Sequence, residues 1–115
     1  MTVDLDWENL GFNYSKLPFR YISYYKDGKW DEGQLTEDAT LHISEASPAL
    51  HYGQEAFEGL KAYRTKDGSI QLFRPDENAK RLQRTADRLL MPQVPVDKFV
   101  DACIQVVRAN EEYVP

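Results

Sequence analysis

The spacing of hydrophobic positions changes once along this chain, close to Pro75. Before that point, short aromatic and β-branched runs alternate with turn residues, which is the pattern of strands joined by hairpins. The run from Phe19 to Tyr25 leads into Asp27-Gly28, and Asp-Gly between two such runs favours a tight hairpin because both residues tolerate positive φ. The pattern therefore predicts strands over residues 19–25, 30–34 and 35–43.

A second hairpin is expected further along the chain, where the runs Leu60–Arg64 and Ile70–Phe73 flank Asp67-Gly68. Two hairpins predict one antiparallel sheet. Between them the sequence predicts a loop over residues 44–48 and a short helix over residues 54–58. Gly59 would end that helix, since glycine adopts positive φ at little cost.

After Pro75 the apolar residues recur every three or four positions, as in amphipathic helices. Pro75 with the acidic residues Asp76 and Glu77 is a typical helix start, and Pro92 ends this first helix. A second helix is predicted from Val96 to about Asn110. Strands followed by helices, segregated along the chain, indicate the α+β class.

Composition is ordinary for one soluble domain of 115 residues, with 42% hydrophobic and 29% charged residues. The net charge of −5 argues against a nucleic-acid surface, which needs clustered positive charge. No apolar run approaches the roughly 20 residues that cross a bilayer, so no membrane segment is expected. Cys103 is the only cysteine. This fits a reducing compartment, and we expect a cytoplasmic protein.

Residue chemistry alone identifies no active site. The sequence has no glycine-rich phosphate loop, and His42 and His51 have no cysteine near them that would make a zinc site. A nucleophilic role for Cys103 is formally open, but its place on the apolar side of the last helix favours inert packing. We therefore expect no metal, and the residues by themselves indicate only an α+β domain.

Two blocks of sequence carry the argument further. Residues 49–64 read ALHYGQEAFEGLKAYR, and residues 72–75, LFRP, are followed by Asn78, Arg81, Arg84 and Met91-Pro92. In order and spacing, these blocks resemble the branched-chain amino-acid aminotransferases, which are fold-type IV pyridoxal-phosphate enzymes. The resemblance covers nearly the whole chain and corresponds to the N-terminal small domain of that family.

The resemblance implies a division of labour between two domains. Residues 1–18 would form an N-terminal arm and residues 19–115 the small α+β domain, while the large domain, with the lysine that forms the Schiff base, would lie outside this chain. None of the seven lysines here resembles that catalytic lysine, so no catalytic residue is assigned and pyridoxal phosphate is not expected to bind covalently. The family's phosphate-binding arginine corresponds to Arg81, whose planar guanidinium suits phosphate oxygens. The alternative is that Arg81 is one of three solvated helix arginines.

The resemblance also implies three residues of the substrate pocket: Tyr52, Phe57 and Phe12. Aromatic walls suit branched aliphatic side chains, since burial contributes roughly 0.8 kcal/mol per CH₂. The alternative is that all three pack in the core. Glu58 and Lys61 have no assigned role, and as i, i+3 neighbours they would form an exposed ion pair.

The implied parent interconverts leucine, isoleucine and valine with their 2-oxo acids, using 2-oxoglutarate and glutamate, and works as a homodimer in amino-acid biosynthesis. Alone, the chain is expected to be inactive and to self-associate through the face that would meet the large domain. The alternatives are another fold-type IV enzyme, either a D-amino-acid aminotransferase or an aminodeoxychorismate lyase, and a non-catalytic binding or assembly module of the same fold.

Overall fold

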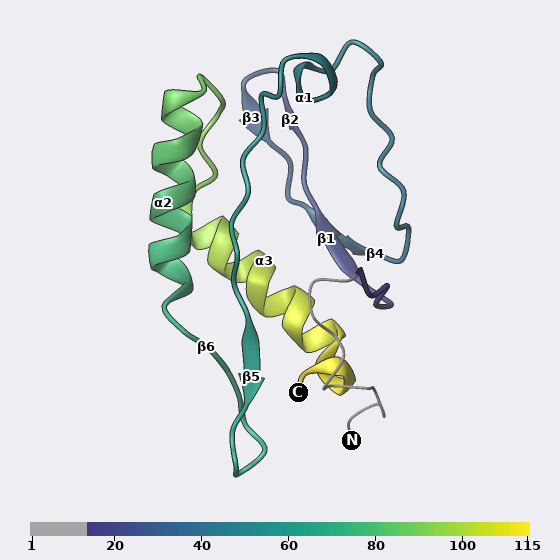
Figure 1. The fold of residues 1–115 in the computed structure, drawn as a ribbon, viewed down its shortest axis with the longest axis vertical. Helices are drawn as coiled ribbons and strands as arrows, with labels where there is room; N and C mark the ends of the chain where they lie inside the picture. Colours follow the sequence, from purple (N-terminus) through teal and green to yellow (C-terminus); the bar gives the residue numbers. More distant parts are fainter. Residues whose placement is uncertain (1–13) are drawn as a thin grey trace.

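Two antiparallel ribbons and two long helices account for most of residues 14–115, the part of the chain that the computed structural model describes (Figure 1). The α+β class is confirmed. The first ribbon contains β1 (Arg20–Ile22), β2 (Tyr25–Lys26), β3 (Lys29–Trp30) and β4 (Gln34–Thr36). The second contains β5 (Ala62–Arg64) and β6 (Ile70–Leu72). The helices are α1 (Pro48–His51), α2 (Pro75–Arg88), α3 (Val96–Ala109) and the 3₁₀ turn η2 (Glu111–Tyr113).

The first ribbon turns at the predicted Asp27-Gly28, where both residues have positive φ, 53° and 82°. β2 pairs with β3 beside this turn, and β1 pairs with β4 further away, with Tyr21 opposite Leu35. Between the two ladders the backbone of Gly33 has a φ of 73°, and the Tyr21 hydroxyl lies 2.0 Å from where a Cβ of residue 33 would be. Only glycine fits there, and the ladder is interrupted at this point.

The strand predicted over 35–43 is short in the structure and ends at Thr36. Two side chains take over the backbone donors that a strand would have used. Thr36 Oγ1 accepts from the Asp38 amide at 3.1 Å, and Asp38 Oδ1 accepts from the Thr40 amide at 2.9 Å. Such local side-chain bonds compete with a strand ladder, so the segment leaves the ribbon.

The two ribbons do not form one sheet. Within residues 14–115 each of the three ladders has two strands, and none pairs with another. The edge of the second ribbon instead bonds to the C-terminal residue, because the Arg64 amide donates to the Pro115 carbonyl at 2.8 Å. The prediction of one antiparallel sheet was therefore wrong, although both hairpins were placed correctly.

The short helix lies earlier than predicted. α1 spans Pro48–His51, and residues 54–58 form no helix. The turn glycine is Gly53, with φ 64°, and not Gly59. Because the chain turns at Gly53, the residues that follow form an extended segment, and side chains of this segment bond to α2 and to the residue that follows it.

α2 and α3 begin and end close to the predicted positions and pack on each other. Ala79 and Ala86, seven residues apart on α2, are buried, and Val114 is the other buried apolar residue of the described chain. The core is therefore small. Much larger apolar side chains, such as Phe73 at 79% exposure, lie on the surface.

Asn110, at the end of α3, joins the helix to the start of β1. Its Oδ1 accepts from the Phe19 amide at 3.0 Å, and its Nδ2 donates to the Phe19 carbonyl at 2.8 Å and to the Val106 carbonyl at 3.0 Å. The residue is only 4% exposed. One buried amide thus satisfies both backbone groups of a residue that is 91 positions away in the sequence.

Leu90 ends α2 in a conformation that favours glycine. Its φ is 57°, its side chain is 89% exposed, and the Met91 amide donates to the Ala86 carbonyl at 2.8 Å across it. We expect Leu90→Gly to raise the free energy of unfolding by about 1 kcal/mol, because the left-handed strain disappears and little packing is lost. Urea denaturation measures this. Leu89→Gly, one residue earlier at negative φ, is the matched control and should destabilise.

Candidate functional site

Residues 52–61, called here the signature segment, lie beside α2 and are held there by side chains (Figure 1). At one end, Gln54 Nε2 donates to the Leu89 carbonyl at 2.7 Å, near the C-terminus of the helix. At the other end, Asn78 Nδ2 donates to the Gly59 carbonyl at 2.9 Å, near its N-terminus. The segment and the helix therefore run antiparallel, and no backbone ladder joins them within the described residues.

Glu58 and Arg81 form a two-bond ion pair at the centre of this contact. Glu58 Oε2 accepts from Arg81 Nε at 2.7 Å, and Oε1 accepts from Arg81 Nη2 at 2.6 Å. Asn78 Nδ2 donates to Glu58 Oε1 at 3.0 Å. The side chain of Glu58 is 8% exposed and that of Arg81 is 60% exposed. A nearly buried carboxylate thus faces the exposed guanidinium. Two charge-assisted hydrogen bonds and one amide bond offset the free-energy cost of burying this charge.

The electrostatics of the pair follow from these bonds. Hydrogen bonds from Arg81 hold the pKa of the Glu58 carboxyl below its usual range, against the opposing effect of burial, and the Asn78 amide and the charge of Arg84 act in the same direction. The same contact raises the pKa of the Arg81 guanidinium. The expected Glu58–Lys61 pair was wrong, because the extended segment turns Glu58 towards α2.

The stability that Glu58 contributes should depend on pH. Its pKa is lower in the folded than in the unfolded chain, so its contribution is complete above the usual value of 4.5 and is lost as the pH falls through the folded pKa below it. Denaturant midpoints measured between pH 7 and pH 3 should fall less steeply for Glu58→Gln than for the unaltered chain. Equal slopes would contradict the assignment. The comparison is needed because the pKa values of Asp31, Asp38 and Asp67 are also lowered by hydrogen bonds.

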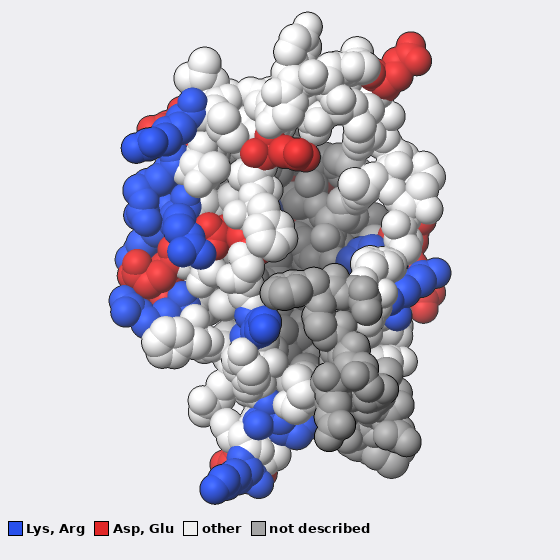
Figure 2. Space-filling model, viewed as in Figure 1, with Lys and Arg blue, Asp and Glu red and all other residues white. Residues whose placement is uncertain are grey.

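Arg81 has one guanidinium edge that no other described residue occupies. An arginine has five N–H donors in a planar fork, and Glu58 takes the edge made by Nε and Nη2. Within residues 14–115 no group accepts a hydrogen bond from Nη1. Lysine and arginine side chains gather along this helix (Figure 2), where the sequence places Lys80, Arg84 and Arg88. The donor set fits a phosphate group, even though one carboxylate is already bound.

Tyr52 and Phe57 are on the surface, with exposed fractions of 87% and 89%. The alternative that they pack in the core of this chain is therefore excluded. Phe57 directly precedes Glu58 in an extended segment, and its ring approaches the position of a Cβ on Gly59 to 3.8 Å. Within the described residues, no side-chain hydrogen bond joins Tyr52 to Glu58 or Arg81. Phe12 lies outside the described residues.

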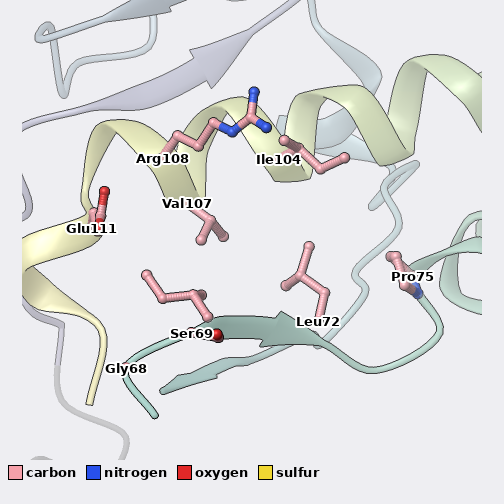
Figure 3. A pocket seen from close by; sticks show the side chains of 9 residues that line it. Gly68, Ser69, Leu72, Pro75, Ile104, Val107, Arg108 and Glu111 are labelled. Atoms are coloured by element: carbon pink, nitrogen blue, oxygen red, sulfur yellow. The ribbon is translucent and has the colours of Figure 1, made fainter. Parts of the chain in front are cut away.

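A cavity of about 520 Å³ lies elsewhere, between the second ribbon and α3 (Figure 3). Leu72 points into it from the ribbon and Val107 from the helix, with Arg108 and Glu111 at its edge. None of the predicted site residues lines it. We place the candidate site at Arg81 because the cavity walls offer no converging set of polar groups, whereas Arg81 combines charge, exposure and a fixed partner.

The lysines and the cysteine of the described residues are exposed or half-buried. Six of the seven lysines are exposed, and the half-buried Lys98 donates from Nζ to the Asp31 carbonyl at 2.5 Å. Cys103 is half-buried, and burial raises the pKa of its thiol, which disfavours the thiolate. In the part of the chain that the structure describes, no three potential metal-ligating side chains gather, and no helix has the length and apolar character to cross a membrane.

Comparison with known proteins shows which proteins this chain resembles. Protein-family profiles give no match. The chain is, however, 68% identical over 110 residues to a branched-chain-amino-acid aminotransferase of Haemophilus influenzae, a match that covers 96% of the chain and 32% of that protein. The resemblance to the branched-chain aminotransferases is confirmed. A Helicobacter pylori aminotransferase of the same name is 54% identical, with the same two shares.

The similarity to branched-chain aminotransferases extends beyond bacteria. A protein of Arabidopsis thaliana, branched-chain-amino-acid aminotransferase 2, chloroplastic, is 43% identical over 114 residues, which cover 98% of this chain and 29% of that protein. The chain thus spans about a third of the length of the curated relatives it matches. The structure adds what the resemblance did not predict, which is the direct bond between Glu58 of one block and Arg81 of the other.

Proposed function

We propose that this chain is the N-terminal small domain of a branched-chain aminotransferase, and that the whole protein converts leucine, isoleucine and valine with 2-oxoglutarate to branched 2-oxo acids and glutamate. The observation that carries the proposal is 68% identity along 96% of the chain to an aminotransferase of that name. The division into an arm over 1–18 and a small domain over 19–115 belongs to the same proposal.

Each proposed residue has one physical task. Arg81 binds the phosphate of pyridoxal phosphate through the guanidinium edge that Glu58 leaves open. Tyr52 and Phe57, with Phe12, bind the aliphatic side chain of the substrate and exclude water from it. Polar side chains would lose hydration there without gaining a partner, which disfavours them. The cofactor, when bound, supplies the electron sink for chemistry at the α-carbon, and the lysine that holds it belongs to the rest of the protein.

The exposure of the site in this chain supports the need for a second domain. Tyr52, Phe57 and Leu90 are each more than 85% exposed, and large apolar side chains exposed in this way are typical of an interaction surface. We infer that the large domain covers this face in the whole protein, and that the whole protein is a cytoplasmic homodimer. Without that domain the chain should neither turn over substrate nor bond the cofactor covalently.

Steady-state transamination tests the proposal. The whole protein, supplied with pyridoxal phosphate and 2-oxoglutarate, should form glutamate with leucine, isoleucine and valine much faster than with D-alanine. Release of pyruvate from aminodeoxychorismate would indicate the lyase alternative, and no turnover of any of these would favour a binding or assembly module. The 115-residue chain alone is the control and should be inactive.

A methionine-directed activity is a second candidate with its own observation. One relative, the methionine aminotransferase BCAT4 of Arabidopsis thaliana, is 44% identical over 114 residues. That value is close to the 43% of a branched-chain aminotransferase from the same plant, so overall identity in this third of the protein does not separate the two substrates. Methionine belongs in the same assay, and a kcat/KM above that for leucine would favour it.

A further inference from the structure

Glu58 is a nearly buried carboxylate beside the proposed phosphate-binding arginine, and the proposed function gives it no task. A carboxylate at 8% exposure needs partners, because burying an unpaired charge is costly. It has three such bonds, two from Arg81 and one from Asn78. Asn78 is itself fixed by its bond to the Gly59 carbonyl. The carboxylate is therefore held by two side chains of α2, and one of these also bonds to the backbone next to Glu58.

This anchoring determines the direction of the Arg81 guanidinium. The group is planar, so fixing the edge made by Nε and Nη2 also fixes where the opposite edge, with Nη1, points. A 60% exposed arginine without such a partner would sample many rotamers, and a ligand would have to select one of them. Glu58 removes that freedom before any ligand binds.

The negative charge of Glu58, unlike its orienting effect on Arg81, disfavours phosphate binding. A carboxylate close to a phosphate repels it, so an ion pair that merely competed with the ligand would weaken phosphate binding. The two roles predict opposite signs for the same substitution. If Glu58 only competes, its neutralisation tightens phosphate binding. If Glu58 orients Arg81, its neutralisation weakens binding although a repulsive charge has been removed.

We propose that Glu58 is a positioning residue that fixes the open edge of the Arg81 guanidinium for the phosphate of pyridoxal phosphate. The proposal rests on the proposed function insofar as it names that ligand. The three hydrogen bonds to a buried carboxylate favour orientation over competition, because a competing group would have to leave Arg81 when the ligand arrives, and Asn78 holds Glu58 in place.

The test compares pyridoxal phosphate with pyridoxal, which has no phosphate group. Both are titrated into the cofactor-free whole protein. The Kd for pyridoxal divided by the Kd for pyridoxal phosphate is the ratio that isolates the contribution of the phosphate group. Glu58→Gln should reduce this ratio about ten-fold and leave the Kd for pyridoxal unchanged. Glu55→Gln removes an exposed carboxylate from the same segment and is the matched control. In an Arg81→Ala background, Glu58→Gln should have no further effect on the ratio.

A general loss of structure would weaken both compounds alike, and that outcome would overturn the proposal, as would tighter binding of pyridoxal phosphate by Glu58→Gln. Should Glu58→Gln not fold, Glu58→Asp keeps the charge but withdraws the carboxylate, and a reduced ratio is again expected, whereas an unchanged ratio would overturn the proposal. Failure of leucine turnover with the ratio still reduced would reject the proposed activity and leave the role of Glu58 standing.

Discussion

Replacing Asn110 with alanine is expected to lower the free energy of unfolding by about 3 kcal/mol, since each buried polar group left unpaired costs about 1–3 kcal/mol. The substitution removes three hydrogen bonds and leaves the amide and carbonyl of Phe19 unpaired at the junction of β1 and α3. For a domain with so few fully buried side chains, this is a large part of the total stability. Urea denaturation followed by tryptophan fluorescence measures it.

Asn110→Asp separates hydrogen bonding from side-chain volume. The oxygen that accepts from the Phe19 amide is retained, but the donor to the Phe19 and Val106 carbonyls becomes an acceptor, so this near-isosteric change should also destabilise at neutral pH. Gln105→Ala in the same helix removes an amide whose bond to Asp101 is exposed, and it should change little. A loss for Asn110→Ala no greater than that for Gln105→Ala would contradict the structural role.

The second large effect concerns the proposed ligand. Arg81→Ala should weaken binding of pyridoxal phosphate to the cofactor-free whole protein about 100-fold, because charge-assisted bonds to phosphate are the strong class of hydrogen bond. Arg81→Lys keeps the charge but not the planar fork, and about a ten-fold loss is expected. Spectrophotometric titration with the cofactor measures both.

Stability must be followed in the same variants. Arg81→Ala leaves the buried Glu58 carboxylate with Asn78 as its remaining partner, so it should also lower the denaturation midpoint. Arg88→Ala, in the last turn of the same helix, removes an exposed arginine without touching the pair and is the matched control. Equal cofactor affinities for the Arg81 and Arg88 variants would remove Arg81 from the proposed site.

The local parts of the fold could be predicted because their causes are local. The turns use positive φ at Asp27, Gly28 and Gly68, and Pro75 with the two acidic residues after it specifies the start of α2. The helix expected over 54–58 failed for a tertiary reason. Gln54 and Glu58 bond to α2 instead of to their own backbone, and no pattern within ten residues indicates that.

The candidate site could be predicted only in part. Family resemblance indicated Arg81, Tyr52 and Phe57 but left Glu58 without a role. A signal was present in the sequence, since the glutamate directly before Gly59 and an arginine of the predicted helix after Pro75 carry complementary charges. Their separation of 23 residues hid it, because spacing rules within one helix do not reach a partner in another element.

The attachment of residues 52–61 by side chains has a consequence for experiments that read motion from the main chain. Within the described part of the structure, the amides from Ala56 to Lys61 donate to no other group, so their protons should exchange with deuterated solvent in seconds even while Glu58 and Gln54 keep the segment in place. Rapid labelling there would thus report missing protection at the peptide groups and not a loose loop.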